Sequence, residues 1–159
     1  LPISGANLGD DTIYSGTVAA AMEGRRLATA AIAVSCVEHN ARHYPTAARV
    51  TLELIERLQR APLPRDTILN VNVPDLPYEQ LKGMLVTRLG HRRTAESAVK
   101  SEDPRGRPIW WVGAAGPEED AGPGTDFHAV NNGYVSVTPL LVDLTKHSAL
   151  DSLRRWIEA

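Results

Sequence analysis

Residues 4–24 read SGANLGDDTIYSGTVAAAMEG, and this stretch decides the fold of the chain. Its first part, residues 4–17, is small and polar and contains three glycines and the adjacent acids Asp10 and Asp11. Residues 18–23 are rich in alanine and contain no helix breaker, which favours a buried helix. A polar, glycine-containing loop that leads into a helix presents backbone N–H groups and the positive end of the helix dipole. The stretch therefore predicts a place where an anion can bind.

Two hydroxyl residues, Ser15 and Thr17, are expected in or near the first turn of this helix. There a hydroxyl group either caps the helix or contacts a phosphate oxygen, and both interpretations stay open. The stretch has neither the lysine and glycine spacing of a P-loop nor the dinucleotide-binding pattern GxGxxG. We expect Asp10 and Asp11 to brace the loop or cap the helix in preference to binding a metal ion.

Length and composition predict one soluble globular domain. The chain has 159 residues, of which 43% are hydrophobic and 23% charged. Its formal net charge of −2 gives no general attraction to nucleic acid or to an anionic membrane. No apolar run reaches the roughly 20 residues that cross a bilayer. The single cysteine, Cys36, is expected to be a buried packing residue, and we expect a cytoplasmic protein.

The residues after the first helix alternate between strand and helix patterns. Residues 30–35 are apolar on both faces, which is typical of an interior parallel strand. Residues 46–60 have a helical period, with Pro45 at the start and a second proline beyond the end. Residues 67–73 are rich in β-branched residues and predict another strand. This alternation predicts an α/β fold.

Several polar residues lie where such a fold places its ligands. Asn70 and Asn72 are near the carboxyl end of their strand, so they either support a site or satisfy loop backbone groups. Asp126 is expected to cap a short helix at residues 127–132, with a position beside the active site as the alternative. His128 lies within that helix and is assigned to the surface or to packing.

Residues 82–113 are expected to project from the domain. Strand patterns at residues 83–89 and 108–113 enclose a long polar segment, which suggests an extended hairpin. The adjacent residues Trp110 and Trp111 point to opposite faces of their strand. We expect one tryptophan to enter the core and the other to meet a second surface, such as a neighbouring subunit.

The last part of the chain contains a loop, a strand and a helix. Residues 113–124 are rich in glycine, proline and acid and predict a loop, and residues 134–139 predict a half-exposed strand. The C-terminal segment 143–159 contains a predicted helix at residues 145–158. The apolar face of that helix is formed by Leu150, Leu153, Trp156 and Ile157. This face is expected to dock on its own domain or on a partner.

Five stretches together resemble the SurE family of survival-protein nucleotidases. In the order of the family they read NLGDD (7–11), YSGTVAAAMEG (14–24), NVNVP (70–74), AGPGTDF (121–127) and GYVSVTPL (133–140). The resemblance extends over nearly the whole chain. It implies a Rossmann-like α/β SurE fold in which residues 1–159 form a single domain without the family's N-terminal segment. It also implies that the projecting hairpin and the C-terminal helix serve oligomerisation.

The same resemblance implies a function. SurE proteins are metal-dependent phosphomonoesterases (5′/3′-nucleotidases) that hydrolyse nucleoside monophosphates and are linked to stationary-phase survival. On this resemblance Asn7, Ser15 and Thr17 are catalytic, and Ser15, Gly16 and Thr17 bind the substrate phosphate. The implied cofactor is Mg²⁺ or Mn²⁺, with Asn7 as a metal ligand. The implied assembly is a homo-oligomer, a dimer or a tetramer, with neither a membrane nor a nucleic acid polymer as partner.

The chain departs from the family pattern at the metal site. Family members begin with a strand that ends in an Asp-Asp pair holding the divalent ion, and this segment is not in the sequence. The pair Asp10–Asp11 is a different one. A further family ligand, an asparagine, aligns with Ile3 when the alignment is counted back from Asp10–Asp11 and with Asn7 when it is counted forward from residues 3–5. Both registers stay open.

These departures leave a second function open. The chain by itself is expected to be inactive, with activity in the complete protein. The alternative is a non-catalytic fragment or remnant that serves as an oligomerisation or anion-binding module. A hydrolase with Ser15 as nucleophile is disfavoured, because the GxSxG pattern is absent.

Overall fold

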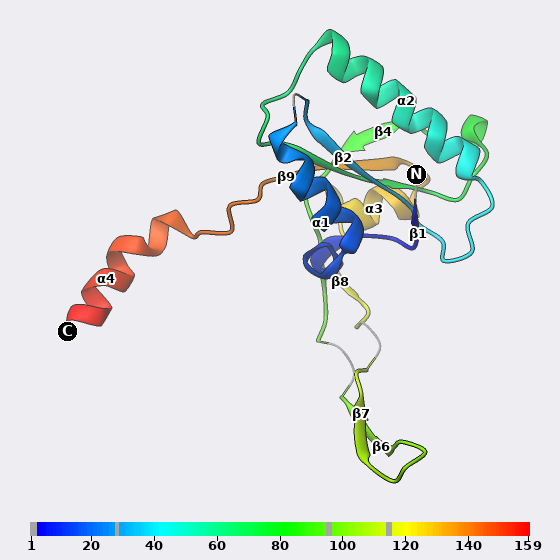
Figure 1. The fold of residues 1–159 in the computed structure, drawn as a ribbon. Coiled ribbons are helices and arrows are strands. Elements are labelled where there is room, and N and C mark those ends of the chain that lie inside the picture. Colours follow the sequence, from blue (N-terminus) through cyan, green and yellow to red (C-terminus); the bar gives the residue numbers. More distant parts are fainter. Residues whose placement is uncertain (1–2, 28, 95–96, 114–115) are drawn as a thin grey trace.

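The computed structural model of the chain describes residues 3–27, 29–94, 97–113 and 116–159. A five-stranded mixed sheet with the order β1-β2-β3-β9-β4 lies at its centre (Figure 1). The strands are β1 (Ile3–Ser4), β2 (Ala31–Cys36), β3 (Ile68–Val73), β9 (Val135–Leu140) and β4 (Met84–Val86). β1, β2 and β3 are parallel, whereas β9 and β4 run in the opposite direction. The α/β class expected from the sequence is confirmed.

Helices cover both faces of this sheet. α2 (Tyr44–Arg60) lies on one face, and α1 (Gly16–Glu23) and α3 (Asp126–Asn131) lie on the other (Figure 1). Side chains alternate along β2, so Val34 packs with the α2 cluster while Ala33 packs against α1. Short 3₁₀ helices lie at η1 (Gly9–Tyr14), η2 (Gly24–Arg26), η3 (Tyr78–Gln80) and η4 (His147–Ala149).

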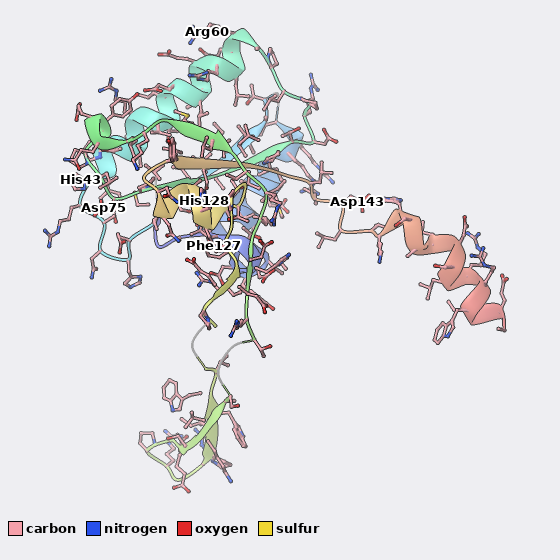
Figure 2. All side chains as sticks on the ribbon, turned by 180° about the vertical axis from the view of Figure 1, so that it is seen from behind. His43, Arg60, Asp75, Phe127, His128 and Asp143 are labelled. Carbon is pink, nitrogen blue, oxygen red and sulfur yellow. The ribbon has the colours of Figure 1, made fainter. Side chains whose placement is uncertain are left out.

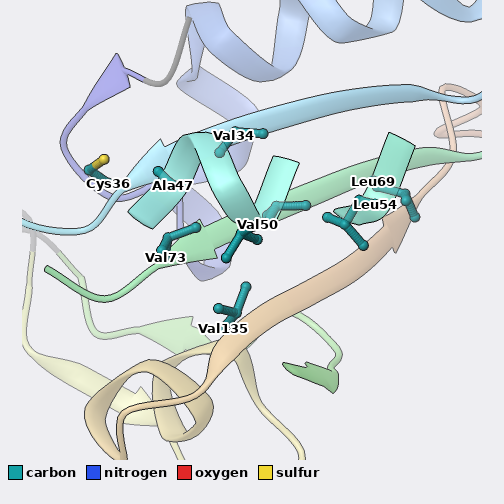
Figure 3. Packing of buried hydrophobic residues seen from close by; sticks show 9 residues of the cluster. Val34, Cys36, Ala47, Val50, Leu54, Leu69, Val73 and Val135 are labelled. Carbon is teal, nitrogen blue, oxygen red and sulfur yellow. The ribbon is translucent and has the colours of Figure 1, made fainter. Parts of the chain in front are cut away.

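The main core lies between α2 and the sheet. Figure 3 shows a cluster of aliphatic side chains from α2, β2, β3 and β9, together with the predicted packing residue Cys36. Val50, Val71 and Val135 are fully buried. Burying one such side chain contributes roughly 1.5–3 kcal/mol. Burial also raises the pKa of the Cys36 thiol, with a smaller contribution from the charge of Asp75.

A carboxyl group fixes the start of α2. Asp75 accepts hydrogen bonds from the backbone N–H groups of Arg42 and His43, and its Oδ1 lies 3.0 Å from Nδ1 of His43 (Figure 2). Burial by itself would raise the pKa of Asp75, but these hydrogen bonds outweigh it and lower the pKa. Cys36 and the Asp75 contacts at the start of α2 thus stabilise the fold and are not part of the candidate site.

Strand β9 is more buried than its sequence pattern predicts. Val135 and Ser136 are fully buried and Thr138 is 3% exposed. The expectation of a half-exposed strand at 134–139 was wrong, because β9 lies between β3 and β4 and is contacted by α3. Both faces of β9 are therefore covered at its start, and an exposed residue appears only at Pro139.

A β-hairpin projects from the body (Figure 1). It consists of β6 (Val99–Glu102) and β7 (Pro108–Trp111), and we call residues 99–111 the hairpin arm. The expected pairing of residues 83–89 with 108–113 was wrong, since β4 belongs to the central sheet. A local turn explains the actual pairing: Asp103 accepts hydrogen bonds from the backbone of Arg105 and Arg107.

Strands β5 (His91–Arg92) and β8 (Glu118–Asp120) join the arm to the body. The expectation of a loop throughout 113–124 was therefore wrong at β8. All five residues of this short ladder are charged or titratable and none is apolar, so the sequence gave no strand signal there.

Both tryptophans of the hairpin arm are exposed, Trp110 by 64% and Trp111 by 63%. The expectation that one of them enters the core was wrong. The arm stands away from the sheet, so neither of its faces meets the core of this chain (Figure 1).

The C-terminal helix α4 (Leu150–Glu158) is also separate from the body (Figure 1). It begins five residues later than the prediction, because Asp143 binds the backbone of Thr145 and the ring of His147 in the preceding segment. The side chains of Thr145 and His147 lower the pKa of Asp143 to about 2. The apolar face expected for this helix is exposed, with Trp156 at 76%. Within the described residues, no helix has the length and hydrophobicity to cross a membrane.

Candidate functional site

The site is built on a loop above the carboxyl ends of the parallel strands. We call residues 5–17 the site loop. The backbone N–H of Asn7 donates to Oδ1 of Asn72 at 2.8 Å, and the carbonyl of Asn7 accepts from the side-chain amides of Asn70 and Asn72 at 2.8 and 3.0 Å. The side-chain amide of Asn7 donates to Oγ of Ser35 at 2.5 Å. These bonds fix the position of Asn7 relative to β2 and β3.

The two asparagines of β3 therefore satisfy loop backbone groups, one of the two roles expected for them. Asn70 and Asn72 are completely buried. Buried amides with direct partners hold a loop more rigidly than solvated ones, because an unpaired buried polar group is costly. Through this contact they also position a predicted site residue.

A buried carboxyl group holds the next part of the site loop. Asp126 is 0% exposed and accepts hydrogen bonds from the backbone N–H groups of Gly9 at 2.7 Å and Gly90 at 2.9 Å. A Cβ atom at Gly9 would lie 2.6 Å from the ring of Phe127, and one at Gly90 would lie 2.3 Å from the carbonyl of Asp120. Both glycines are therefore required by close packing (Figure 2 shows Phe127 in this region).

The structure corrects the role expected for Asp126. The side chain that caps α3 is Thr125, whose Oγ1 accepts from the backbone N–H of His128 at 3.1 Å. Asp126 instead joins segments that are 117 and 36 positions away in the sequence. Sequence reasoning missed this function, since the only signal was an acid at a helix start. His128 is half-buried on α3, in line with a packing or surface role.

The two acids of the site loop bind the base of the hairpin. Asp10 lies 2.9 Å from Nδ1 of His91 and accepts from the backbone N–H of Arg92, and Asp11 accepts from Nε of Arg92 at 3.0 Å. The hydrogen bond with His91 lowers the pKa of Asp10, and the same bond raises the pKa of His91. The expectation that the acid pair braces the loop is confirmed.

The start of α1 is open to solvent. Oγ of Ser15 accepts from the backbone N–H of Val18 at 3.1 Å, so the predicted cap is confirmed. Gly16 is exposed, and Ser15 and Thr17 are half-buried. A hydroxyl group that accepts one bond can still donate its own proton. The first N–H groups of a helix have no acceptor within that helix, so those of Gly16 and Thr17 are available to a ligand.

The glycine at position 16 is not explained by the protein itself. Its φ is not positive, and a Cβ atom added there would meet no atom within 4 Å. Neither backbone conformation nor packing thus requires a glycine. A ligand that approaches the helix start closely would require one.

A groove of about 690 Å³ between α1, β2 and α2 borders this helix start at Gly16 and Thr17. The rest of its lining is almost entirely small or aliphatic, and includes Ala20, Leu27, Ile32 and Leu52. Such a surface does not suit an anion. Anion-binding atoms are confined to the end of the groove where α1 begins.

The described residues do not by themselves form a divalent-ion site. Among them, no group of three or more histidine, cysteine, aspartate or glutamate side chains lies close enough to hold a metal ion. Asp10 and Asp11 are engaged by His91 and Arg92. Asn7 offers a side-chain oxygen, the kind of hard ligand that Mg²⁺ takes, but one amide oxygen is not a site.

The mixed sheet, its helices on both faces and the ligand-accessible helix start above its parallel strands define a Rossmann-like α/β protein. A family model described as "Survival protein SurE" matches residues 3–96. The chain belongs to the SurE family.

Comparisons with individual proteins agree with this family assignment. The chain is 61% identical over 153 residues to "5'-nucleotidase SurE" of Methylococcus capsulatus, covering 96% of this chain and 61% of that protein. It is 60% identical over 156 residues to the protein of the same name from Halorhodospira halophila, covering 98% and 62%. Its structure is similar to the crystal structure of the SurE protein from Aquifex aeolicus, with a TM-score of 0.82, 43% identity, and coverage of 99% and 63%. The chain thus spans about three fifths of the length of these relatives.

Proposed function

We propose that the complete protein is a phosphomonoesterase of the 5′-nucleotidase type, which hydrolyses nucleoside monophosphates to nucleoside and phosphate. The observation that carries the proposal is the open start of α1, with Ser15, Gly16 and Thr17 close in sequence to the firmly held Asn7. The names of the relatives, "5'-nucleotidase SurE", support the same activity.

Each residue of the helix start has a task in this proposal. The hydroxyl groups of Ser15 and Thr17 and the backbone N–H groups of Gly16 and Thr17 donate to the phosphoryl oxygens. The positive end of the α1 dipole favours the same charge. Donors that are fixed before the reaction stabilise negative charge as it develops in the transition state, without reorganisation.

The proposal includes Mg²⁺ or Mn²⁺ as cofactor. When bound, such an ion offsets phosphate charge and activates a water molecule. In this chain, the side-chain oxygen of Asn7 is the candidate ligand. No suitable carboxylate cluster exists among the described residues, so carboxylate ligands would have to come from elsewhere in the complete protein.

A homo-oligomer, a dimer or a tetramer, is also part of the proposal. The exposed tryptophans of the hairpin arm and the exposed apolar face of α4 support it, since large exposed apolar surfaces mark interaction sites. We place the protein in the cytoplasm, which the single buried cysteine supports.

A second candidate function is a non-catalytic module for oligomerisation or anion binding. The observation that favours it is the absence, among the described residues, of a metal-binding cluster. Phosphatase activity of the complete protein distinguishes this candidate from the first.

Substitutions at Ser15 in the complete protein test the proposed function. Ser15→Ala is expected to lower turnover of a nucleoside monophosphate on the order of 10²-fold, the effect of losing one donor to developing charge. Ser15→Asp keeps an acceptor for the N–H of Val18 but brings a negative charge to the phosphate, so it should be inactive while α1 stays capped. Full activity in Ser15→Asp would remove Ser15 from the site.

Chelation tests the cofactor. EDTA should abolish activity of the complete protein and Mn²⁺ should restore it, whereas the 159-residue chain should be inactive with and without Mn²⁺. Activity indifferent to EDTA contradicts the metal part of the proposal. A complete protein without phosphatase activity under any of these conditions favours the non-catalytic module.

A further inference from the structure

A second cavity lies on the other side of the site loop, between η1 and the base of the hairpin arm. Its volume is about 580 Å³. From η1 it is lined by Asp10, Asp11 and Tyr14, and from the strand ends of the hairpin base by Arg92, Arg93 and Gly116 among others. The site described above uses the start of α1 and leaves this cavity unexplained.

Tyr14 connects the cavity with the helix start. It is the last residue of η1 and directly precedes Ser15, and 88% of its surface is exposed. Consecutive Cα atoms are only 3.8 Å apart. A phosphate bound at Ser15 therefore lies beside the residue whose side chain lines this cavity.

Arg92, which also lines the cavity, is itself held in place. Its Nε donates to Asp11 at 3.0 Å, and its guanidinium group lies 4.8 Å from the centre of the Phe127 ring. Phe127 is completely buried. A pre-formed cavity binds a ligand without the cost of ordering its walls.

The charges that line the cavity balance one another. Asp10 and Asp11 both line it, and each is paired with a basic residue. Arg93 is paired with Glu119 at 3.8 Å. A cavity with balanced charge and an exposed aromatic ring is suited to bind a neutral, planar group that has hydrogen-bond donors and acceptors along its edge.

We propose that this cavity receives the base of the nucleoside monophosphate and that Tyr14 stacks on it. The inference rests on the proposed function, because it assigns the phosphate of the same substrate to the start of α1. Tyr14 is then a specificity-determining residue: it contacts the base and leaves the phosphate to Ser15 and Thr17.

The test compares AMP with ribose 5-phosphate, which has the same phosphate and sugar but no base. In the complete protein, Tyr14→Ala should lower the ratio of kcat/KM for AMP to that for ribose 5-phosphate about tenfold, the effect of losing one base–aromatic stack. Tyr14→Phe keeps the ring and should keep the ratio. Ile13→Ala is the matched control, because Ile13 is also on η1 and 72% exposed but does not line the cavity.

In the kinetic comparison, two results overturn the inference: an unchanged ratio in Tyr14→Ala, or an equal change of the ratio in Ile13→Ala. Adenosine, which has no phosphate, separates this inference from the proposed function. Saturation-transfer NMR should show contact between the complete protein and the base protons of adenosine, and Tyr14→Ala should abolish the signal. If the complete protein shows a Tyr14-dependent signal but no phosphatase activity, the proposed function is refuted and the base site is supported. If the wild type shows no signal, the base site is refuted.

Discussion

The site loop and the hairpin arm are opposite in sequence and in structure. The site loop is mostly polar, yet buried side chains of Asn70, Asn72 and Asp126 hold its backbone. The hairpin arm carries adjacent tryptophans, yet both are exposed. Hydrophobicity by itself thus predicts neither the rigid region nor the exposed one. What differs is whether the rest of the fold supplies partners.

The largest effect is expected in the rigid region, at Asp126. Asp126→Ala leaves the buried N–H groups of Gly9 and Gly90 without acceptors. At about 1–3 kcal/mol for each, the free energy of unfolding should fall by about 2–6 kcal/mol. Urea denaturation of the wild type and the variant measures it.

Asp66→Ala is the matched control for that measurement, because Asp66 lies in an exposed turn. It should change the free energy of unfolding by less than about 0.5 kcal/mol. Equal stability of the two variants would show that Asp126 does not hold the site loop.

A smaller effect is expected in the hairpin arm, and it concerns association between chains and not the stability of the monomer. Trp111→Ala should leave the free energy of unfolding of the monomer within about 0.5 kcal/mol of the wild type, because the side chain is 63% exposed. If the hairpin arm is an interface, the same substitution should weaken association by about 2 kcal/mol. Analytical ultracentrifugation over a range of concentrations measures the association.

Lys100→Ala is the control on the same arm, since Lys100 is exposed on β6. If Trp111→Ala and Lys100→Ala weaken association equally, or if neither weakens it, Trp111 has no specific role in the interface. A large loss of monomer stability in Trp111→Ala would contradict the exposed position itself.

The smallest effect concerns the junction of the two regions, where His91 meets Asp10. The pKa of His91 is raised by Asp10, so this stabilisation is present below the ordinary pKa of histidine and is lost as the pH rises through the folded value. The pKa of Asp10 is lowered, so its contribution is lost as the pH falls through that lowered value. The pair should therefore stabilise the fold between about pH 4 and pH 6.5.

His91→Gln should lower the urea midpoint slightly at pH 5.5 and leave it unchanged at pH 8. The shift should be much smaller than that of Asp126→Ala, because His91 and Asp10 are 61% and 44% exposed. A midpoint difference that is larger at pH 8 than at pH 5.5 contradicts the assigned direction.

Sequence reasoning predicted much of the body and part of the site. It found β2, β3 and α2 from hydrophobic patterns, Ser15 as the cap of α1, and Asp10 and Asp11 as bracing residues. It failed at β8, at the partner of β7 and at Asp126. These errors have one cause, since each depends on contacts that no local pattern encodes.

By itself, the sequence determined the family, the α/β class and the helix start capped by Ser15, because caps, periodicity and short motifs act over a few neighbouring residues. Only the tertiary structure decided what holds the site loop. Asn72 and Asp126 reach Asn7 and Gly9 across 65 and 117 positions of sequence. A buried hydrogen bond depends on distance in space, and only folding brings such groups together.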